Sequence, residues 1–396
     1  MAARQRILVM PAGSFQVPAI RTAHSMGLEV VAIDRRPAAP GLALADIAEA
    51  VDPTDLDKAI DVGKRHAVSA VVSIANDPCV VPCAVVANAL GLPGLPYETA
   101  LRTRNKVLAR KRLAAALPQY CPKFCALSSV SGLARAVDQV GLPLVLKPQE
   151  GNGSKGVIRV EAAAMLEKAF QYAQSFSKDG VLVAEERLAG REVSLEGITF
   201  GGETELVAIT DKMTCPPPFC AEIGHTIPAD LPGDAADALE TAFREIIAAF
   251  GIESGASHCE LFATKDGVRL VELGARLAGG CIASHLAPLA TGIDLVRAAI
   301  DLALGKRPDL ERTRSRAAAI RFLDARPGRV RSVTGIDDAR AAPGVVDAVV
   351  NVGPGDIVFP LQHSDHRVGY VIADGADRGE AARNLEHAVG LIAIEC

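Results

Sequence analysis

The sequence predicts a mixed α/β and α+β protein in which the pattern of strands and helices changes along the chain. Three observations support this prediction. Over the first hundred residues, short apolar runs alternate with helical patterns, which predicts a Rossmann-like domain with a doubly wound parallel sheet. From about residue 123, strand patterns follow one another with fewer helices between them. A β-rich segment then closes the chain after residue 310. The length of 396 residues suits two to three domains.

The first hundred residues supply the elements of the parallel sheet in order. We expect strands in "RILVM", "LEVVAID" and "VSAVVSIA", and helices in "FQVPAIRTAHSMG", at 55–66 and in "VVPCAVVANALG". The turn "PAGSFQ" lacks the G-x-G-x-x-G spacing of a dinucleotide site, although Asp34 ends the second strand where a ribose-binding acid would lie. We therefore interpret Asp34 as a strand-end residue that faces solvent.

The pattern changes after "GLPGLP" at 91–96, a stretch of glycine and proline that predicts a boundary between domains. "TALRTRNKVLARKRLAAAL" predicts one basic, exposed helix that carries Lys106. The proline-rich stretch 211–232 is expected to be irregular. Helices are predicted at 129–140, 161–176, 234–250, 292–304 and 377–390, and strands in "PKFCAL", "PLVLKP", "GVIRV", "GVLVAEE", "EVSLEGITF", "SHCELFAT" and "GVRLVELGAR".

Composition excludes several classes of protein. The 42 basic and 47 acidic residues give a net charge of -5, so the chain lacks the basic footprint of a nucleic-acid-binding surface. Its nine cysteines contain no C-x-x-C pair, which predicts mostly buried thiols in a reducing cytoplasm. No apolar stretch approaches the length of a membrane span, so we expect no membrane association.

A glycine-rich loop follows the apolar run in "LPLVLKPQEGNGSKGV". The run ends at Lys147, and the loop holds Gly151, Gly153, Ser154 and Gly156. Exposed backbone N–H groups together with lysine side chains make a cradle for phosphate. The alternative is an ordinary hairpin turn with a solvated lysine.

Two glutamates are twelve residues apart on either side of a "KDG" turn. A hairpin of that length brings Glu260 and Glu272 opposite each other on one face. Two such carboxylates repel unless they hold cations. Magnesium, which takes one or two carboxylates together with phosphate oxygens, suits this arrangement. Taken alone, Glu272 would be read as a surface strand residue.

With "TRNKVLARKRL", "LVAEERLAGREVS", "HCELF" and "LVELGARLAGG", these stretches resemble the ATP-grasp superfamily over nearly the whole chain. The pattern "HCEL…VELGAR" is similar to the carboxylate–amine ligase branch, and to bacterial L-amino-acid ligases in particular. The resemblance implies a pre-ATP-grasp domain over 1–100 and an ATP-grasp module over 101–310, with its lid subdomain at about 123–190. It also implies a β-rich C-terminal segment over 311–396 that packs on the module.

The resemblance implies roles for the residues that match the family's motifs. Glu260 and Glu272 would hold Mg2+, or Mn2+, and Arg276 would be the catalytic cation that faces an acyl phosphate. Substrate contacts are expected at Glu222, His225, His258, Gly279 and Gly280. ATP would be bound by Lys106, Lys147, Gly151, Gly153, Ser154, Gly156, Glu185, Leu188 and Glu192.

The chain departs from the family's pattern at one position. Many members carry Asn two residues after the second glutamate, as a further magnesium ligand, and this chain has Gly274. The L-amino-acid ligases also lack that Asn. The number of metal ions held by protein groups is therefore left open.

The activity implied is an ATP-dependent ligase that activates a small carboxylate as an acyl phosphate and joins it to an amine. Its partners would be these two small molecules, ATP and a second copy of the chain in a homodimer. Two alternatives within the superfamily are a bicarbonate-activating carboxylase and a purine-pathway ligase. Outside enzymes, the alternative is a nucleotide-binding regulatory protein, against which the retained lysines, glutamates and Arg276 argue.

Overall fold

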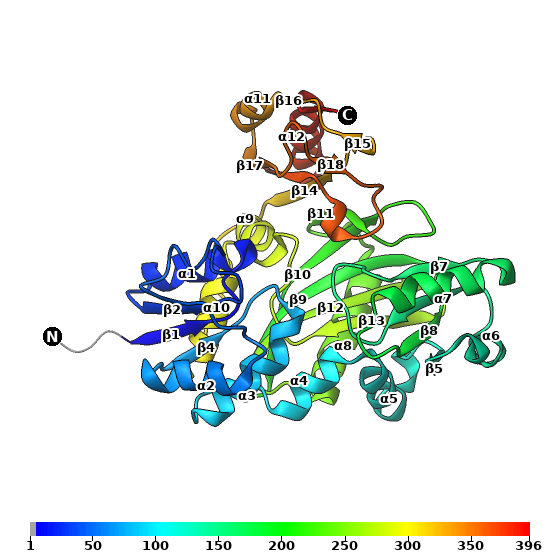
Figure 1. The fold of residues 1–396 in the computed structure, drawn as a ribbon, viewed down its shortest axis with the longest axis horizontal. Coiled ribbons are helices and arrows are strands. Elements are labelled where there is room, and N and C mark those ends of the chain that lie inside the picture. The colour runs from blue at the N-terminus through cyan, green and yellow to red at the C-terminus, as the bar shows by residue number, and fades with distance from the viewer. Residues whose placement is uncertain (1–4) are drawn as a thin grey trace.

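The computed structural model describes residues 5–396; residues 1–4, at the start of the predicted first domain, lie outside it. The chain forms an N-terminal lobe, a central module that extends into a separate subdomain, and a C-terminal lobe above them (Figure 1). Among the described helices, none is long and apolar enough to cross a membrane. Most of the nine cysteines are buried, as predicted, and all nine are free thiols.

The N-terminal lobe is a parallel four-stranded sheet in the order β3-β2-β1-β4, which confirms the predicted fold class. Its two faces bury alternate residues of β1, because Ile7 and Val9 pack with α1 while Leu8 packs with α2. The elements are β1 (Arg6–Val9), α1 (Val17–Ser25), β2 (Glu29–Ile33), β3 (Ile47–Glu49), α2 (Leu56–Arg65), β4 (Ala70–Val72) and α3 (Val80–Ala89).

The separate subdomain is an antiparallel sheet in the order β5-β8-β6-β7. Leu144 and Leu146 of this sheet pack against Leu133 and Phe170 of two helices. This subdomain carries the glycine loop between β6 and β7. Its elements are β5 (Phe124–Leu127), α6 (Leu133–Val140), β6 (Leu144–Pro148), β7 (Ile158–Val160), α7 (Leu166–Ser175) and β8 (Leu182–Glu186).

The largest sheet has eight strands in the order β13-β12-β9-β10-β11-β14-β19-β17. It continues across the predicted boundary at 310, so the C-terminal strands extend the sheet of the central module. Its strands are β9 (Arg191–Phe200), β10 (Glu203–Thr214), β11 (Glu222–Ile227), β12 (Gly255–Thr264), β13 (Gly267–Gly274), β14 (Ala317–Leu323), β17 (Val345–Val350) and β19 (Gly369–Gly375).

Helices pack beside this sheet, and short strand pairs complete the C-terminal lobe. Phe243 and Phe250 of α8 are fully buried in the core beneath β9 and β12. The helices are α8 (Gly233–Phe250), α9 (Ala287–Thr291), α10 (Leu295–Ala303), α11 (Ile336–Ala341) and α12 (Arg378–Leu391). The short strands are β15 (Gly328–Arg329), β16 (Ser332–Thr334), β18 (Ile357–Val358) and β20 (Ala393–Glu395).

The predicted single helix at 99–117 is wrong, because the structure has α4 (Tyr97–Arg104) and α5 (Lys106–Ala116). Asn105 is extended between them, and its side chain accepts a hydrogen bond from the Leu108 N–H, which caps α5. The helix is also not wholly exposed, since Arg110 is buried.

Two other predictions are corrected. The stretch 211–232 is not irregular throughout, because β10 runs to Thr214 and β11 begins at Glu222. Only the prolines and their neighbours interrupt the pairing of these strands, since proline has no N–H to donate. Asp34 does not face solvent: it is 2% exposed and accepts hydrogen bonds from Arg36 and from the Ala12 N–H.

Candidate active site

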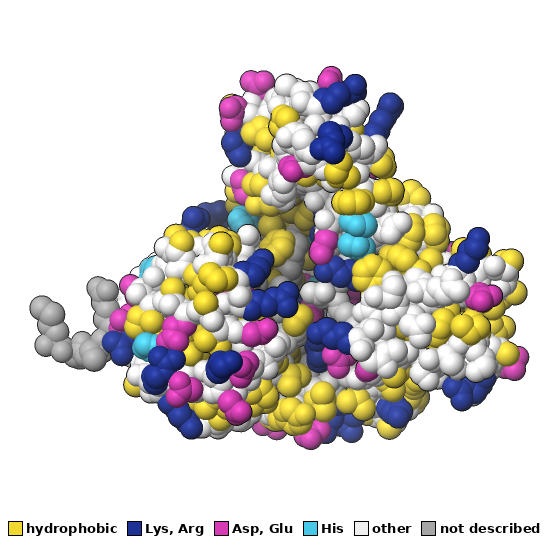
Figure 2. Space-filling model, viewed as in Figure 1, with side chains coloured by type: hydrophobic (Ala, Val, Ile, Leu, Met, Phe, Trp, Pro, Cys, Tyr) yellow, Lys and Arg dark blue, Asp and Glu magenta, His cyan; other side chains and the backbone are white. Residues whose placement is uncertain are grey.

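A cavity of about 1450 Å³ lies where the lobes meet, and residues of all of them line it. The space-filling view shows the molecule hollowed between the N-terminal lobe and the separate subdomain, with Lys and Arg side chains at its edges (Figure 2). The volume exceeds that of a pocket for a single drug-sized ligand. The cavity therefore has room for a nucleotide and for a second molecule beside it.

The cavity brings together nearly all the residues that the sequence singled out. Those in its lining are Lys106, Lys147, Gly151, Gly153, Ser154, Glu185, Leu188, Glu192, Glu222, His225, His258, Glu260, Glu272, Arg276, Gly279 and Gly280. Gly156 is the exception. It has φ +71°, and a Cβ there would lie 2.8 Å from Pro148 and 3.0 Å from Phe176, so this glycine is needed for packing.

Glu185 holds Lys147 in place. Its carboxylate accepts from Arg110 Nε and Nη2 at 2.8 and 2.9 Å and from Lys147 Nζ at 2.8 Å. Burial acts to raise the pKa of Glu185, but the two cations bring it down to about 2. The side chain is thus committed to these ion pairs, and a nucleotide could meet Glu185 only at its backbone. Arg110, which the sequence analysis missed, lies four residues after Lys106 and so on the same helix face.

The predicted carboxylate pair is present, since Glu260 and Glu272 are directly opposite each other in the β12–β13 register. Each already has a lysine partner. Lys212 Nζ is 2.8 Å from Glu260 Oε2, and Lys106 Nζ donates to Glu272 Oε1 at 3.2 Å. The repulsion between the two carboxylates is therefore relieved by lysines from β10 and α5.

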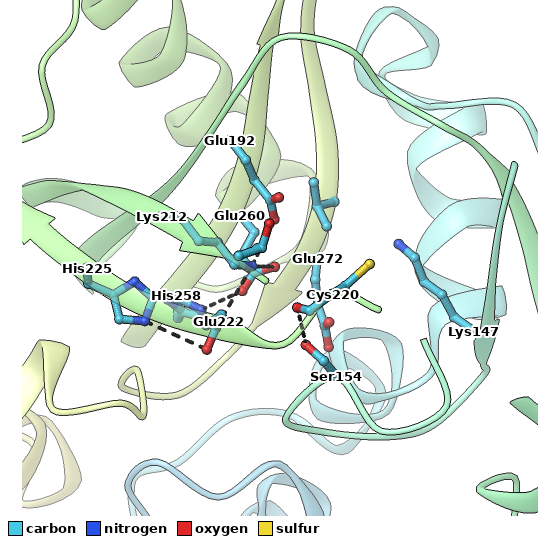
Figure 3. A network of polar contacts seen from close by, with 12 residues as sticks. Lys147, Ser154, Glu192, Lys212, Cys220, Glu222, His225, His258, Glu260 and Glu272 are labelled. Carbon is cyan, nitrogen blue, oxygen red and sulfur yellow. Dashed lines mark hydrogen bonds and ion pairs between the residues drawn. The ribbon is translucent and has the colours of Figure 1, made fainter. Parts of the chain in front are cut away.

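Lys212 is the centre of the polar network (Figure 3). Its Nζ is 2.8 Å from Glu192 Oε1, 2.8 Å from Glu260 Oε2 and 3.3 Å from Glu222 Oε1. Burial acts to lower its pKa, but the three carboxylates hold it well above the usual value for lysine. Lys212 was not predicted, because the chain from residue 211 was expected to be irregular. The alternation of β10, which runs to Thr214, would have placed Lys212 on the same strand as its neighbours.

His258 faces two acids. Its Nδ1 is 2.6 Å from Glu196 Oε1, and its Nε2 is 3.4 Å from Glu260 Oε1. Burial by itself would lower the pKa of His258, but the two carboxylates raise it to about 10. Glu196, fully buried, is a further residue that the sequence analysis missed. The imidazolium thus ties the side chain of Glu260 to the sheet.

The C-terminal lobe supplies one wall of the cavity. Arg367 donates to the Glu222 backbone oxygen at 2.9 Å and to its Oε2 at 3.0 Å, and its guanidinium lies 3.7 Å from the centre of the Phe322 ring. His225 Nε2 lies 3.7 Å from Glu222 Oε2. A Cβ at Gly280 would be 3.4 Å from both His225 and Phe322, so the missing side chain leaves this wall open.

The glycine loop is held by contacts of its central residues. Ser154 donates to the Cys220 backbone oxygen at 3.0 Å (Figure 3). The Gly153 carbonyl accepts from the Ser364 N–H at 3.0 Å, and Lys155 pairs with Asp365 at 2.6 Å. A segment of the C-terminal lobe thus lies against the loop.

Comparison with known proteins agrees with this geometry. Residues 140–284 match the ATP-grasp domain, and residues 321–396 match the L-amino acid ligase C-terminal domain 2. An uncharacterized protein of Sinorhizobium fredii, y4rH, is 30% identical over 349 residues, which cover 86% of this chain and 71% of that protein. The chain belongs to the ATP-grasp carboxylate–amine ligase family.

Solved structures share the fold of this chain, and a further relative matches it in sequence. The crystal structure of an L-amino acid ligase from Bacillus licheniformis has a TM-score of 0.86 at 22% identity, covering 100% of this chain and 99% of that one. Phosphoribosylglycinamide synthetase from Anaerococcus prevotii has a TM-score of 0.77 at 18% identity, with 99% and 100% covered. A formate-dependent phosphoribosylglycinamide formyltransferase of Synechococcus sp. is 25% identical over 98% of this chain and 96% of its own length.

The paired glutamates of the ligase fit a magnesium ion that arrives with nucleotide phosphates. Within residues 5–396, no group of three or more His, Cys, Asp or Glu side chains could hold a metal ion by itself. Glu260 and Glu272 supply the one or two carboxylates that Mg2+ takes beside phosphate oxygens. Gly274 adds no ligand: a Cβ there would lie 3.3 Å from Cζ of Arg276, which lies against this glycine. The predicted roles of the individual residues stay predictions, as does the use of Mn2+.

We expect His258→Gln to destabilise the nucleotide-free protein in a pH-dependent way when metal is removed with a chelator. Because its folded-state pKa of about 10 exceeds the unfolded value of about 6.5, the charged imidazole stabilises the fold fully below pH about 6.5. That stabilisation falls as the pH rises toward 10. Urea unfolding of both proteins should show the largest difference near pH 6 and a much smaller one near pH 9.

The exposed histidine His24, paired with Asp46, provides the control His24→Gln, which should change the unfolding free energy little. A His258→Gln deficit that increased with pH would contradict the ion pairs.

Lys212→Met should lower the unfolding free energy by about 3–5 kcal/mol in chelator, because three partly buried carboxylates lose their shared cation. Millimolar Mg2+ should restore more stability to this variant than to the wild type, since a divalent ion can replace the missing charge. The exposed pair Lys58–Asp55 gives the control Lys58→Met, whose unfolding should closely match that of the wild type. Equal stability of Lys212→Met and wild type in denaturant titrations would rule out the network.

Proposed function

We propose that the protein uses ATP and Mg2+ to activate a small carboxylate as an acyl phosphate and then joins it to an amine, releasing ADP and phosphate. The observation that carries this proposal is the meeting of Lys106, Lys147, the Glu260–Glu272 pair and Arg276 in one cavity. The L-amino acid ligase domain over 321–396 favours an amino acid as the carboxylate and an amide or peptide as the product.

The chemistry needs positioning of the reactants and neutralisation of their charge more than it needs a protein nucleophile. A carboxylate oxygen of the substrate attacks the γ-phosphorus of ATP, and the bond to ADP breaks. The neutral amine nitrogen then attacks the acyl carbon, the bond to phosphate breaks, and the proton that the nitrogen gives up leaves with the phosphate. Lys106 and Lys147 would bind the transferring phosphate, and Arg276 would stabilise the charge that develops on the acyl phosphate. When bound to Glu260 and Glu272, Mg2+ would neutralise charge on the phosphate oxygens.

Exclusion of water is the second requirement, because hydrolysis of an acyl phosphate competes with attack by the amine. The glycine loop 151–156 would supply it as a lid over the phosphates. Its contacts with Cys220 and Ser364 support this role, since they hold the loop across the cavity. Glu222 and His225, beside the wall formed by Arg367 and Phe322, would contact the amino acid.

A second candidate follows from the formyltransferase relatives, whose name specifies formate and phosphoribosylglycinamide. In that case the small carboxylate would be formate. The match to the L-amino acid ligase domain favours amino acids over it. The predicted bicarbonate-activating carboxylase, homodimer and cytoplasmic location stay predictions.

The test is phosphate release from MgATP with pools of amino acids, offered singly and in pairs, with formate plus phosphoribosylglycinamide and with bicarbonate as separate arms. We expect release that needs amino acids and a product in which two of them are joined, identified by mass spectrometry. Phosphate release only in the formate arm or only in the bicarbonate arm would assign the function to those substrates instead. ATP binding without release in any arm would defeat the proposal.

Once substrates are known, Arg276→Ala should lower the rate of amide formation by about 100- to 1000-fold, because the charge of the acyl phosphate loses its cation. Nucleotide affinity, measured by calorimetry, should stay close to that of the wild type. Arg321→Ala is the control for losing an arginine elsewhere, since Arg321 pairs with Glu386 in the C-terminal lobe. Full activity of Arg276→Ala would remove Arg276 from the mechanism.

A further inference from the structure

Asp77 is an acidic residue that the N-terminal lobe contributes to the lining of the cavity. Asp77 follows β4, in a short 3-10 turn that begins at this residue. It lies 199 residues from Arg276 and pairs with it through two hydrogen bonds. Arg276 Nε donates to Asp77 Oδ1 and Nη2 donates to Oδ2, both at 2.9 Å. This two-point geometry fixes the plane and direction of a guanidinium, which a single contact would not do.

The turn that carries Asp77 is itself fixed. The Asn76 side chain accepts from the Cys79 N–H at 3.0 Å and so closes the turn. The Ala75 N–H donates to the Leu277 carbonyl at 3.2 Å, with Ala75 at φ +51°, a conformation that non-glycine residues rarely adopt. The backbone before Asp77 is thus bonded to the backbone just after Arg276, which makes the ion pair part of a two-segment junction.

The arginine is confined from its other side as well. A Cβ at Gly274 would lie 3.3 Å from Arg276 Cζ and 3.5 Å from its Nε, so the side chain passes over the space that glycine leaves. Of the five N–H donors of the guanidinium, two go to Asp77 and one goes to the Leu277 carbonyl at 3.3 Å. Two donors are left, in a group that lines the cavity.

The pair is deeply placed, with 12% of the Arg276 side chain and 14% of the Asp77 side chain exposed. Burial acts to raise the pKa of Asp77, but Arg276 keeps it below the usual value, so both partners stay charged. Removing one partner of such a pair leaves the other charge uncompensated. The carboxylate therefore holds Arg276 in one direction and compensates its charge.

We propose that Asp77 is the positioning residue for Arg276, so that the N-terminal lobe aims the cation that serves the reacting groups of the central module. This inference rests on the proposed function, because it takes Arg276 as the cation of the acyl phosphate. Asp77 acts only through Arg276 and makes no bond to the reacting atoms. The N-terminal lobe then completes the active site.

The first test is Asp77→Asn, which keeps the shape of the side chain and removes its charge. We expect kcat for amide formation to fall about 10- to 100-fold, with KM for ATP close to wild type, since Lys106 and Lys147 are untouched. Glu49→Gln is the control: Glu49 lies in β3 of the same lobe, is partly buried and accepts from Arg65 through both oxygens at 3.1 and 2.8 Å, away from the cavity lining. Wild-type kcat in Asp77→Asn, with Arg276→Ala inactive, would overturn the inference and leave the proposed function intact.

The second test is chemical rescue, which a merely structural role would not affect. In Arg276→Ala, the Asp77 carboxylate remains to bind free guanidinium ion, and we expect millimolar guanidinium to raise the rate about tenfold. In the double variant Arg276→Ala/Asp77→Ala, rescue should be lost. The double variant leaves no unpaired charge and so remains folded.

Rescue of equal size in both variants, or in neither, would overturn the positioning role. Arg276→Ala with a wild-type rate would instead defeat the assignment of Arg276 in the proposed function. The two failures are therefore distinguishable.

Discussion

Carboxylates placed on one face of a sheet must be neutralised, and the arrangement of the cavity follows from this constraint. Five adjacent strands, β13, β12, β9, β10 and β11, contribute Glu272, Glu260, Glu192, Lys212 and Glu222. Four of these groups are acids and only one is a base. The single ammonium of Lys212 contacts three of the acids, and the fourth takes Lys106 from a helix outside the sheet.

The remaining cations come from other parts of the chain, which draws the lobes together. The helix that brings Lys106 also brings Arg110, which with Lys147 neutralises Glu185. Arg367 of the C-terminal lobe pairs with Glu222. When such a pair is largely buried, removing one partner destabilises the fold, mainly because the other charge is left unpaired. The ion pairs therefore favour one mutual arrangement of the lobes more than they add to stability.

Much of this could be predicted from the sequence, where a pattern is local. The alternation of strands and helices in the first hundred residues predicted the parallel sheet, and the spacing of Glu260 and Glu272 across "KDG" predicted that they oppose each other. Both depend on the periods of strand and hairpin. The superfamily and its ligase branch followed from several short motifs found together.

The residues that sequence analysis missed have partners far along the chain. Asp77, Arg110, Glu196, Lys212 and Arg367 are ordinary charged residues until the fold brings each beside its partner, for instance Asp77 beside Arg276 over 199 residues. Helix 99–117 was misjudged for a related reason. Its positive charges suggest exposure. Arg110 is nevertheless buried, because its charge is paired with Glu185 on strand β8. Gly156 was taken for a phosphate-binding residue because a loop glycine gives no sign of whether it faces a ligand or Phe176.

A stretch of four residues of the C-terminal lobe, 364–367, contacts two different parts of the cavity through three of its members. Ser364 and Asp365 contact the glycine loop, and Arg367 contacts Glu222 and stacks on Phe322. The contact with the glycine loop and the wall beside Glu222 are thus built on one short stretch of backbone. A change of backbone within this stretch would alter both at once. A chimera that took only residues 364–367 from a relative would exchange the resting contact of the loop and the shape of the wall in a single graft.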